Sequence, residues 1–217
     1  MMANLTIGID LGLVQDYTAM AVVERAVHYV EPAFQEPRST DYFLVRGIKR
    51  WPLGTAYKDV IREVGELLHQ RAEQGWLDAQ IVIDGTGVGR PVVALFDQAH
   101  RERRLGNWWP MSYTITGGRE VARRLVPKSD LVGTVQALLQ GGRLIVADSL
   151  EMAPVLRKEL LAFEAKILPT GHNSYGSARE RDHDDIVLAV ALACWYRHFH
   201  SDPAWLDPAT LPTARRV

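Results

Sequence analysis

Four acidic residues lie where an apolar segment of the sequence meets a turn, and they are Asp10, Asp84, Asp184 and Asp185. The first two each end a short apolar run typical of a buried strand, and the adjacent pair opens a long apolar segment typical of a buried helix. Open α/β sheets place their ligand sites at the carboxyl ends of strands. If the two strands are parallel neighbours, Asp10 and Asp84 meet at one edge of the sheet, and the helix brings Asp184 or Asp185 there.

Carboxylates that converge without basic partners repel one another, and such a cluster persists when divalent cations neutralise it. Oxygen ligands with no cysteine and little histidine suit Mg²⁺ or Mn²⁺ rather than Zn²⁺. Two such ions about 4 Å apart are the usual device for phosphodiester hydrolysis. We therefore expect Asp10, Asp84, Asp184 and Asp185 to bind two Mg²⁺ or Mn²⁺ ions.

Each of these acids, taken singly, also has a plainer explanation. An aspartate at a strand end often accepts hydrogen bonds from a turn, and one at a helix start often caps the helix. The adjacent pair is more specific, because it precedes a helix too apolar to lie on the surface. Asp185 is in line with the small residues Ala189 and Ala193, so we expect Asp185 to face the first strand and Asp184 to lie at the rim or on the second ion.

The segments that would position these acids alternate between strand-like and helix-like patterns. Strands are predicted at 5–9, 18–24, 42–48, 80–83, 111–115 and 144–146. Helices are predicted at 55–74, from Pro91 onward, and at 129–139, 151–167 and 182–200, with a polar loop at 169–181. This order predicts an α/β fold whose mixed sheet has three antiparallel first strands, then parallel strands, with helices on both faces.

Bulk properties bound the class of protein. The 217 residues, 47% apolar and 24% charged, suit one domain, which we expect to span 1–200 and to be followed by a tail at 201–217. The sequence has no apolar run long enough to cross a bilayer and no signal peptide, and its single cysteine, Cys194, cannot form an internal disulfide. We therefore expect a cytoplasmic protein without a membrane partner.

Basic residues gather in one stretch of a chain whose formal net charge is only −1. The stretch holds only two acids, Glu102 and Glu120, beside Arg101, Arg103, Arg104, Arg119, Arg123, Arg124 and Lys128. A DNA-binding protein need not be basic overall, but its basic residues should cluster. We expect this stretch to lie on the face that carries the acids, and a solvated helix and loop is the alternative.

Four motifs carry a resemblance to a known family. They are Ile-Gly-Ile-Asp-Leu-Gly at 7–12, Ile-Asp-Gly-Thr-Gly-Val-Gly at 83–89, Pro-Lys-Ser-Asp-Leu-Val at 127–132 and His-Asp-Asp-Ile-Val-Leu-Ala-Val-Ala-Leu-Ala at 183–193. Their order and spacing resemble the C-terminal nuclease domain of phage terminase large subunits, which belongs to the ribonuclease H-like and RuvC-like superfamily. Glu159 and Tyr175 also match, and the resemblance covers residues 5–200 or so.

The resemblance implies a ribonuclease H-like fold and a metal-dependent endonuclease that hydrolyses double-stranded DNA during phage DNA packaging. By position, Asp10, Asp84, Asp184 and Asp185 match the metal-binding acids. Lys128 matches a basic position that steadies a phosphate or the developing charge, and a surface lysine before a helix is the alternative. The implied partners are double-stranded DNA and a terminase ATPase, small terminase subunit or portal, in the host cytoplasm.

The chain departs from that family in one respect, because it contains no Gly-x-x-x-x-Gly-Lys-Ser/Thr motif for an ATPase motor. Three alternatives remain open. A RuvC-type Holliday-junction resolvase would use Asp182 and Asp185 as its acidic pair. An actin-like ATPase or sugar kinase would bind phosphate at the turns after Asp10 and Asp84, and a non-catalytic binding module would keep the fold without a metal.

Overall fold

The computed structural model describes residues 4–12, 16–30, 38–75, 79–87, 89–118, 124–167, 173–177 and 184–200. Within these ranges the main sheet has seven strands in the order β6-β5-β4-β1-β2-β3-β7. The antiparallel neighbours are β1 (Asn4–Asp10), β2 (Ala19–Val30) and β3 (Arg38–Arg50). The parallel strands are β4 (Ala79–Asp84), β5 (Pro110–Thr116) and β6 (Leu125–Pro127) beside β1, and β7 (Leu144–Val146) beside β3. The predicted mixed sheet is confirmed.

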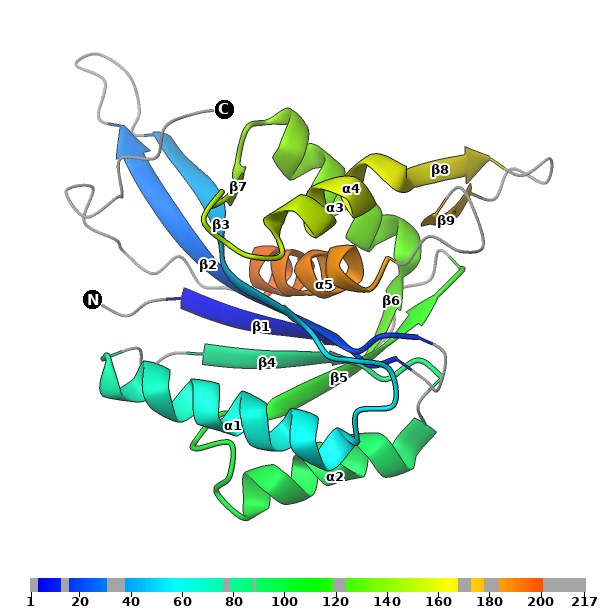
Figure 1. Ribbon diagram of the computed structural model, residues 1–217. Coiled ribbons are helices and arrows are strands. Elements are labelled where there is room, and N and C mark those ends of the chain that lie inside the picture. Colours follow the sequence, from blue (N-terminus) through cyan, green and yellow to red (C-terminus); the bar gives the residue numbers. More distant parts are fainter. Residues whose placement is uncertain are drawn as a thin grey trace.

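Helices cover both faces of this sheet, as predicted (Figure 1). The helices on one face are α1 (Tyr57–Glu73) and α2 (Gly89–Arg101), and those on the other are α3 (Lys128–Gln140), α4 (Ala153–Ala162) and α5 (Asp185–Phe199). Apolar side chains of α1 and α2 pack with those of β1 and β4 into one core cluster, and α5 packs with β2 and β3 into another. No helix of the described ranges is long and apolar enough to span a membrane.

The buried helix α5 determines how closely the second layer approaches the sheet. Every residue from 185 to 195 is buried, which explains why this segment is apolar on all sides. A Cβ atom at Gly8 of β1 would overlap the carbonyl oxygen of Ala189 and lie 3.0 Å from the amide nitrogen of Ala193. The prediction that small residues let this helix approach the first strand is confirmed.

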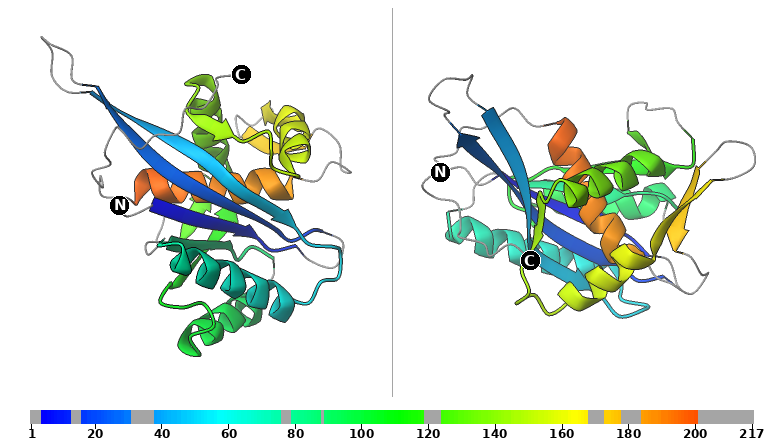
Figure 2. Two further views of the ribbon diagram at one scale, coloured as in Figure 1. Left: turned by 60° about the vertical axis from the view of Figure 1, so that its left-hand side comes forward. Right: turned by 90° about the horizontal axis from the view of Figure 1, so that it is seen from above.

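Strands β2 and β3 are longer than the apolar segments that predicted them. Their pairing continues through residues 25–30 and 38–42, and Figure 2 shows this ribbon projecting beyond the rest of the sheet. Arg25 and Asp41 form an ion pair across it, with 2.6 Å between Nη2 and Oδ2. The β2 part of the ribbon is largely apolar, but its partner in β3, Arg-Ser-Thr-Asp at 38–41, is polar, so apolar alternation alone does not predict that part of β3.

One predicted helix is wrong in its second half. Helix α4 ends at Ala162, and the chain continues as β8 (Phe163–Ile167), which pairs with β9 (Asn173–Ser177) inside the expected polar loop. The sequence Phe-Glu-Ala-Lys-Ile fits strand alternation as well as a helix, and pairing with a segment beyond it decides between the two. The edge strand β6 was not predicted. Asp182, His183 and the expected tail at 201–217 lie outside the described residues.

Candidate active site

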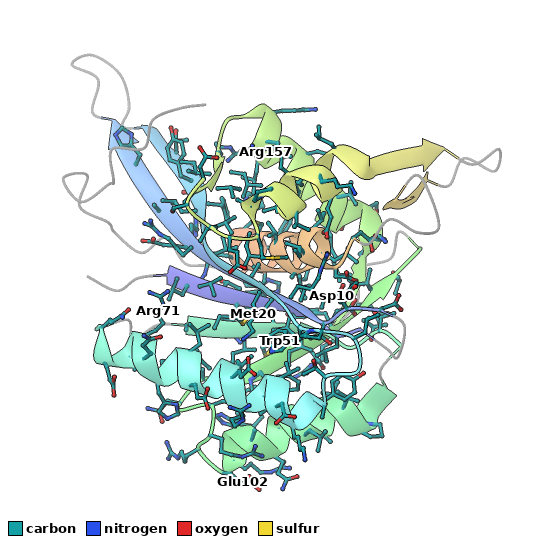
Figure 3. The ribbon with its side chains drawn as sticks, in the orientation of Figure 1. Asp10, Met20, Trp51, Arg71, Glu102 and Arg157 are labelled. Carbon is teal, nitrogen blue, oxygen red and sulfur yellow. The ribbon has the colours of Figure 1, made fainter. Side chains whose placement is uncertain are left out.

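Asp10 and Asp84 are the last residues of β1 and β4, and they are partners in register in these two parallel strands. The same row continues across the sheet, because Asp10 is opposite Ala19 of β2, and Ala19 is opposite Arg50 of β3. Residues in register point to the same face, and Asp10 shares the face of Gly8, which meets α5. The two aspartates therefore lie on the α5 side of the sheet, at its carboxyl edge, where Figure 3 labels Asp10.

Asp184 and Asp185 enter the site at the start of α5. Asp185 is only 6% exposed, and its Oδ2 lies 3.3 Å from Nη2 of Arg50. Asp184 is the N-cap residue and is more exposed, and its Oδ2 lies 3.0 Å from Nζ of Lys128. The two adjacent acids therefore face different cations, Asp185 in the interior and Asp184 at the rim.

The first turn of α5 is capped by another residue, Glu159 of α4. The side chain of Asp184 makes no capping hydrogen bond. Instead, the amides of Ile186 and Val187 each donate to Oε2 of Glu159 over 3.1 Å. These are the two amides that an N-cap side chain usually satisfies. Helix capping therefore does not explain the Asp184 side chain.

Arg50 joins the cap to the acidic cluster. Its Nη2 forms an ion pair with Oε1 of Glu159 and also faces Asp185, and its guanidinium lies 5.0 Å from the centroid of the Tyr17 ring. Sequence reasoning assigned no role to Arg50 or Glu159. Glu159 could have been identified from its match to the family motifs. Arg50 could not, because it reaches Asp185 only through the pairing of three strands.

The turn after β4 holds the carboxylate of Asp84. The amide of Thr86 donates to Oδ1 of Asp84 over 2.7 Å, and Oγ1 of Thr86 accepts a hydrogen bond from the amide of Ile115 in β5, also over 2.7 Å. Asp84 thus accepts a hydrogen bond from the turn, as an aspartate at a strand end often does without any part in catalysis. The same contacts fix the carboxylate beside Asp10 with 7% of the residue exposed.

The electrostatics of the cluster centre on Asp10. Burial raises the pKa of its carboxyl well above the usual range, and repulsion from Asp84, Asp185 and Asp184 raises it further, whereas Lys128 lowers it. Burial also raises the pKa of Asp84, against the hydrogen bonds of the following turn and the charge of Lys128. The cluster therefore holds more negative charge than its neighbours offset, which favours protonation or a bound cation.

The carboxylates of this cluster are suitable ligands for a metal ion, but they are not arranged around a single ion. Among the described residues, no three acidic, histidine or cysteine side chains are arranged to hold one ion. Asp184 and Asp185 each face a basic side chain instead. Carboxylate oxygens around a buried, charge-rich Asp10 are the donors that a hard divalent cation prefers. Coordination would require Asp184 or Asp185 to turn from its basic partner.

The described residues of the predicted basic stretch do not form one surface. Helix α2 starts beside the turn after β4 and runs away from it, so Arg101, Arg103 and Arg104 lie at its far end, where the Arg104 carbonyl approaches α1. Figure 3 shows Glu102 of this segment far from Asp10. The expectation that the whole stretch shares the face of the acids is wrong for this part. Arg119 and Arg123 lie outside the described residues, whereas Lys128, beyond β6, contacts the cluster.

Comparisons with known proteins give matches in structure only. The sequence matches no protein-family model, and no curated protein matches it. The large terminase nuclease from thermophilic phage G20c with bound magnesium is 20% identical, with a TM-score of 0.59 over 88% of this chain and 80% of that chain. The Thermus phage P74-26 large terminase nuclease domain is 18% identical, with a TM-score of 0.55 over 94% and 84% of the two chains.

A viral relative of these domains has the same fold. The human cytomegalovirus terminase nuclease domain is 12% identical, with a TM-score of 0.53 over 90% of this chain and 84% of that chain. The phage G20c nuclease has also been solved with bound cobalt, and the cytomegalovirus domain after soaking with manganese. The ribonuclease H-like fold implied by the motifs is therefore confirmed as the fold of large terminase nuclease domains.

Proposed function

We propose that this chain is a metal-dependent endonuclease that hydrolyses phosphodiester bonds of double-stranded DNA. The observation that carries the proposal is the convergence of Asp10, Asp84 and Asp185 at one sheet edge, around the Asp10 carboxyl, whose pKa is raised by burial and further by its acidic neighbours. Like charges held together in the interior cost stability, so a cation that binds them explains their presence. Solved terminase nucleases of the same fold contain magnesium or cobalt.

The proposed roles follow the burial of the acids. Asp10, Asp84 and Asp185 are buried or half-buried and would hold two Mg²⁺ or Mn²⁺ ions, with Asp184 completing the second site from the rim. Bound divalent ions supply Lewis acidity and neutralise charge on the phosphate. Lys128 is half-exposed beside Asp184, so its ammonium would donate to a phosphate oxygen of DNA at the mouth of the site.

The proposed partners come from the same resemblance. Double-stranded DNA is the proposed substrate, and a terminase ATPase, a small terminase subunit or a portal is the proposed protein partner, in the cytoplasm of a phage host. An ATPase motif is missing from the sequence, so a packaging motor would come from another chain or domain. The domain boundary near residue 200 stays part of this proposal.

A cleavage assay tests the proposal. Supercoiled plasmid and linear duplex are incubated with the protein in Mn²⁺ or Mg²⁺, with EDTA as the metal-free arm. Cleavage is expected with either metal, none with EDTA, and none for Asp10→Asn. Glu73→Gln is the matched control, because this exposed residue ends α1 at the edge of the sheet away from the acids. Full cleavage in EDTA, or by Asp10→Asn, would contradict the proposal.

Three further measurements separate the alternatives. A four-way DNA junction added to the substrate panel would be cut in preference to linear duplex by a RuvC-type resolvase. Stabilisation by ATP in thermal unfolding would favour an actin-like ATPase or sugar kinase. A titration without Mg²⁺ or Mn²⁺ binding would favour a non-catalytic module.

A further inference from the structure

One guanidinium serves two carboxylates at the inner end of the acidic cluster. Nη2 of Arg50 pairs with Oε1 of Glu159 and lies 3.3 Å from Oδ2 of Asp185. Glu159 and Asp185 are buried, with 6% and 8% of their side-chain areas exposed, and Arg50 is half-buried, with 15% exposed. Attraction between opposite charges falls with distance and is strong away from water. Arg50 donates a hydrogen bond from Nη2 to Glu159 in addition to the ion pair, whereas its contact with Asp185 is an ion pair at 3.3 Å, so Glu159 holds the arginine more firmly.

Glu159 is held in place independently of Arg50. Its other oxygen, Oε2, accepts hydrogen bonds from the amides of Ile186 and Val187, at the positive end of the α5 dipole. These two bonds fix the carboxylate while Oε1 faces the arginine. Arg50 is in turn restrained by the Tyr17 ring, so it stays within reach of both acids. Glu159 is thus held in place and competes with Asp185 for the guanidinium of Arg50.

We propose that Glu159 is a positioning residue that holds Arg50 and thereby keeps the Asp185 carboxylate available to a divalent cation. This inference rests on the proposed function of the cluster. An arginine freed from Glu159 would pair with Asp185 through two of its N–H groups, since the planar guanidinium matches a carboxylate in this way. That pairing would neutralise a metal ligand and weaken metal binding.

The test is Mn²⁺ binding, measured from the free Mn²⁺ signal in electron paramagnetic resonance, on three forms of the full chain. These are the wild type, Glu159→Gln, and the double variant Arg50→Met with Glu159→Gln. Glutamine keeps an acceptor for the two amides of α5 but loses the charge that holds Arg50. Mn²⁺ binding is expected to weaken about tenfold in Glu159→Gln, which corresponds to about 1.4 kcal/mol, and to return to the wild-type level or become tighter in the double variant.

If Glu159 only capped α5, the two variants would bind Mn²⁺ equally well, because both keep the acceptor for the two amides and both lose the carboxylate. Equal Mn²⁺ affinity of Glu159→Gln and the wild type would overturn the inference, and so would a double variant as weak as the single one. If circular dichroism shows that Glu159→Gln is unfolded, the double variant decides: weaker binding than the wild type overturns the inference. A wild type that neither binds Mn²⁺ nor cleaves DNA overturns the proposed function as well.

Discussion

The contact between Gly8 and α5 links the packing of the core to the position of the acidic cluster. A Cβ atom at Gly8 would meet the backbone of Ala189 and Ala193 rather than a flexible side chain. The substitution Gly8→Ala is therefore accommodated only if α5 moves away from β1. Such a movement carries the start of the helix, and Asp185 with it, away from Asp10, which lies two residues beyond Gly8 on the same face of β1.

The size of both effects follows from this geometry. Overpacking a core costs about 1–3 kcal/mol, and a clash with backbone atoms places Gly8→Ala near the upper end, at about 3 kcal/mol. In a domain of this size each kcal/mol corresponds to about 2–4 °C in Tm, so the expected decrease is about 6–12 °C. A displacement of catalytic groups by about 1 Å lowers a rate on the order of 100-fold, which is the expected loss of cleavage in the folded variant.

Thermal unfolding by circular dichroism and plasmid cleavage at 25 °C measure the two effects. The matched control is Gly133→Ala in α3, where an added Cβ meets nothing within 4 Å. Alanine stabilises an exposed helix position by about 0.5–1 kcal/mol relative to glycine, so this control is expected to raise the Tm slightly. If Gly8→Ala had the Tm and the cleavage rate of the wild type, the position of α5 would not depend on glycine at residue 8.

The acidic cluster makes three more outcomes measurable. Asp84→Asn is expected to lower cleavage by orders of magnitude and leave the Tm unchanged or higher, because burial raises the pKa of this carboxyl; normal cleavage would remove Asp84 from the site. The raised pKa of Asp10 means that its protonated form stabilises the metal-free protein, and this stability is lost as pH rises through the folded-state pKa. Asp10→Asn is therefore expected to have the Tm of the wild type at pH values below the usual pKa of aspartate. Its Tm should exceed that of the wild type increasingly as the pH rises from there to the raised pKa, and a Tm difference that does not change with pH would contradict this. Asp185→Ala is expected to abolish cleavage, whereas Asp184→Ala, at the rim, is impaired and partly rescued by Mn²⁺; wild-type activity in both would mean that the pair takes no part in catalysis.

The strand ends and the last helix were predictable because their signals are local. The apolar runs before Asp10 and Asp84 stop at these residues, and parallel pairing of the two strands then places them side by side. The small residues Ala189 and Ala193 indicated the close approach of α5, although the matching Gly8 on β1 was not identified as its partner. Local hydrophobic patterns thus predicted most of the sheet and the meeting of Asp10 and Asp84 at one of its edges.

Features that depend on distant pairing were not predictable in the same way. Arg50 reaches the cluster through a row of three strands, and Glu159 caps a helix that begins 26 residues later, at Asp185. The prediction that Arg101, Arg103 and Arg104 lie on the face of the acids was wrong for the opposite reason. These residues are close to the acidic turn in the sequence but not in space. The 13 residues of α2 span about 20 Å at about 1.5 Å per residue, so they carry this segment away from the acidic edge.

The position of α5 also constrains when during synthesis the site can form. This helix lies between the sheet and the helices α3 and α4, yet it follows all of them along the chain. A growing chain on the ribosome therefore exposes the sheet face around Ala19 and Ala21 until residue 185 and those after it have emerged. Asp10 and Asp84 meet their third and fourth carboxylates only at that moment. A nascent chain is thus expected not to cleave DNA. A fragment that ends at residue 180 is expected to bind no Mn²⁺.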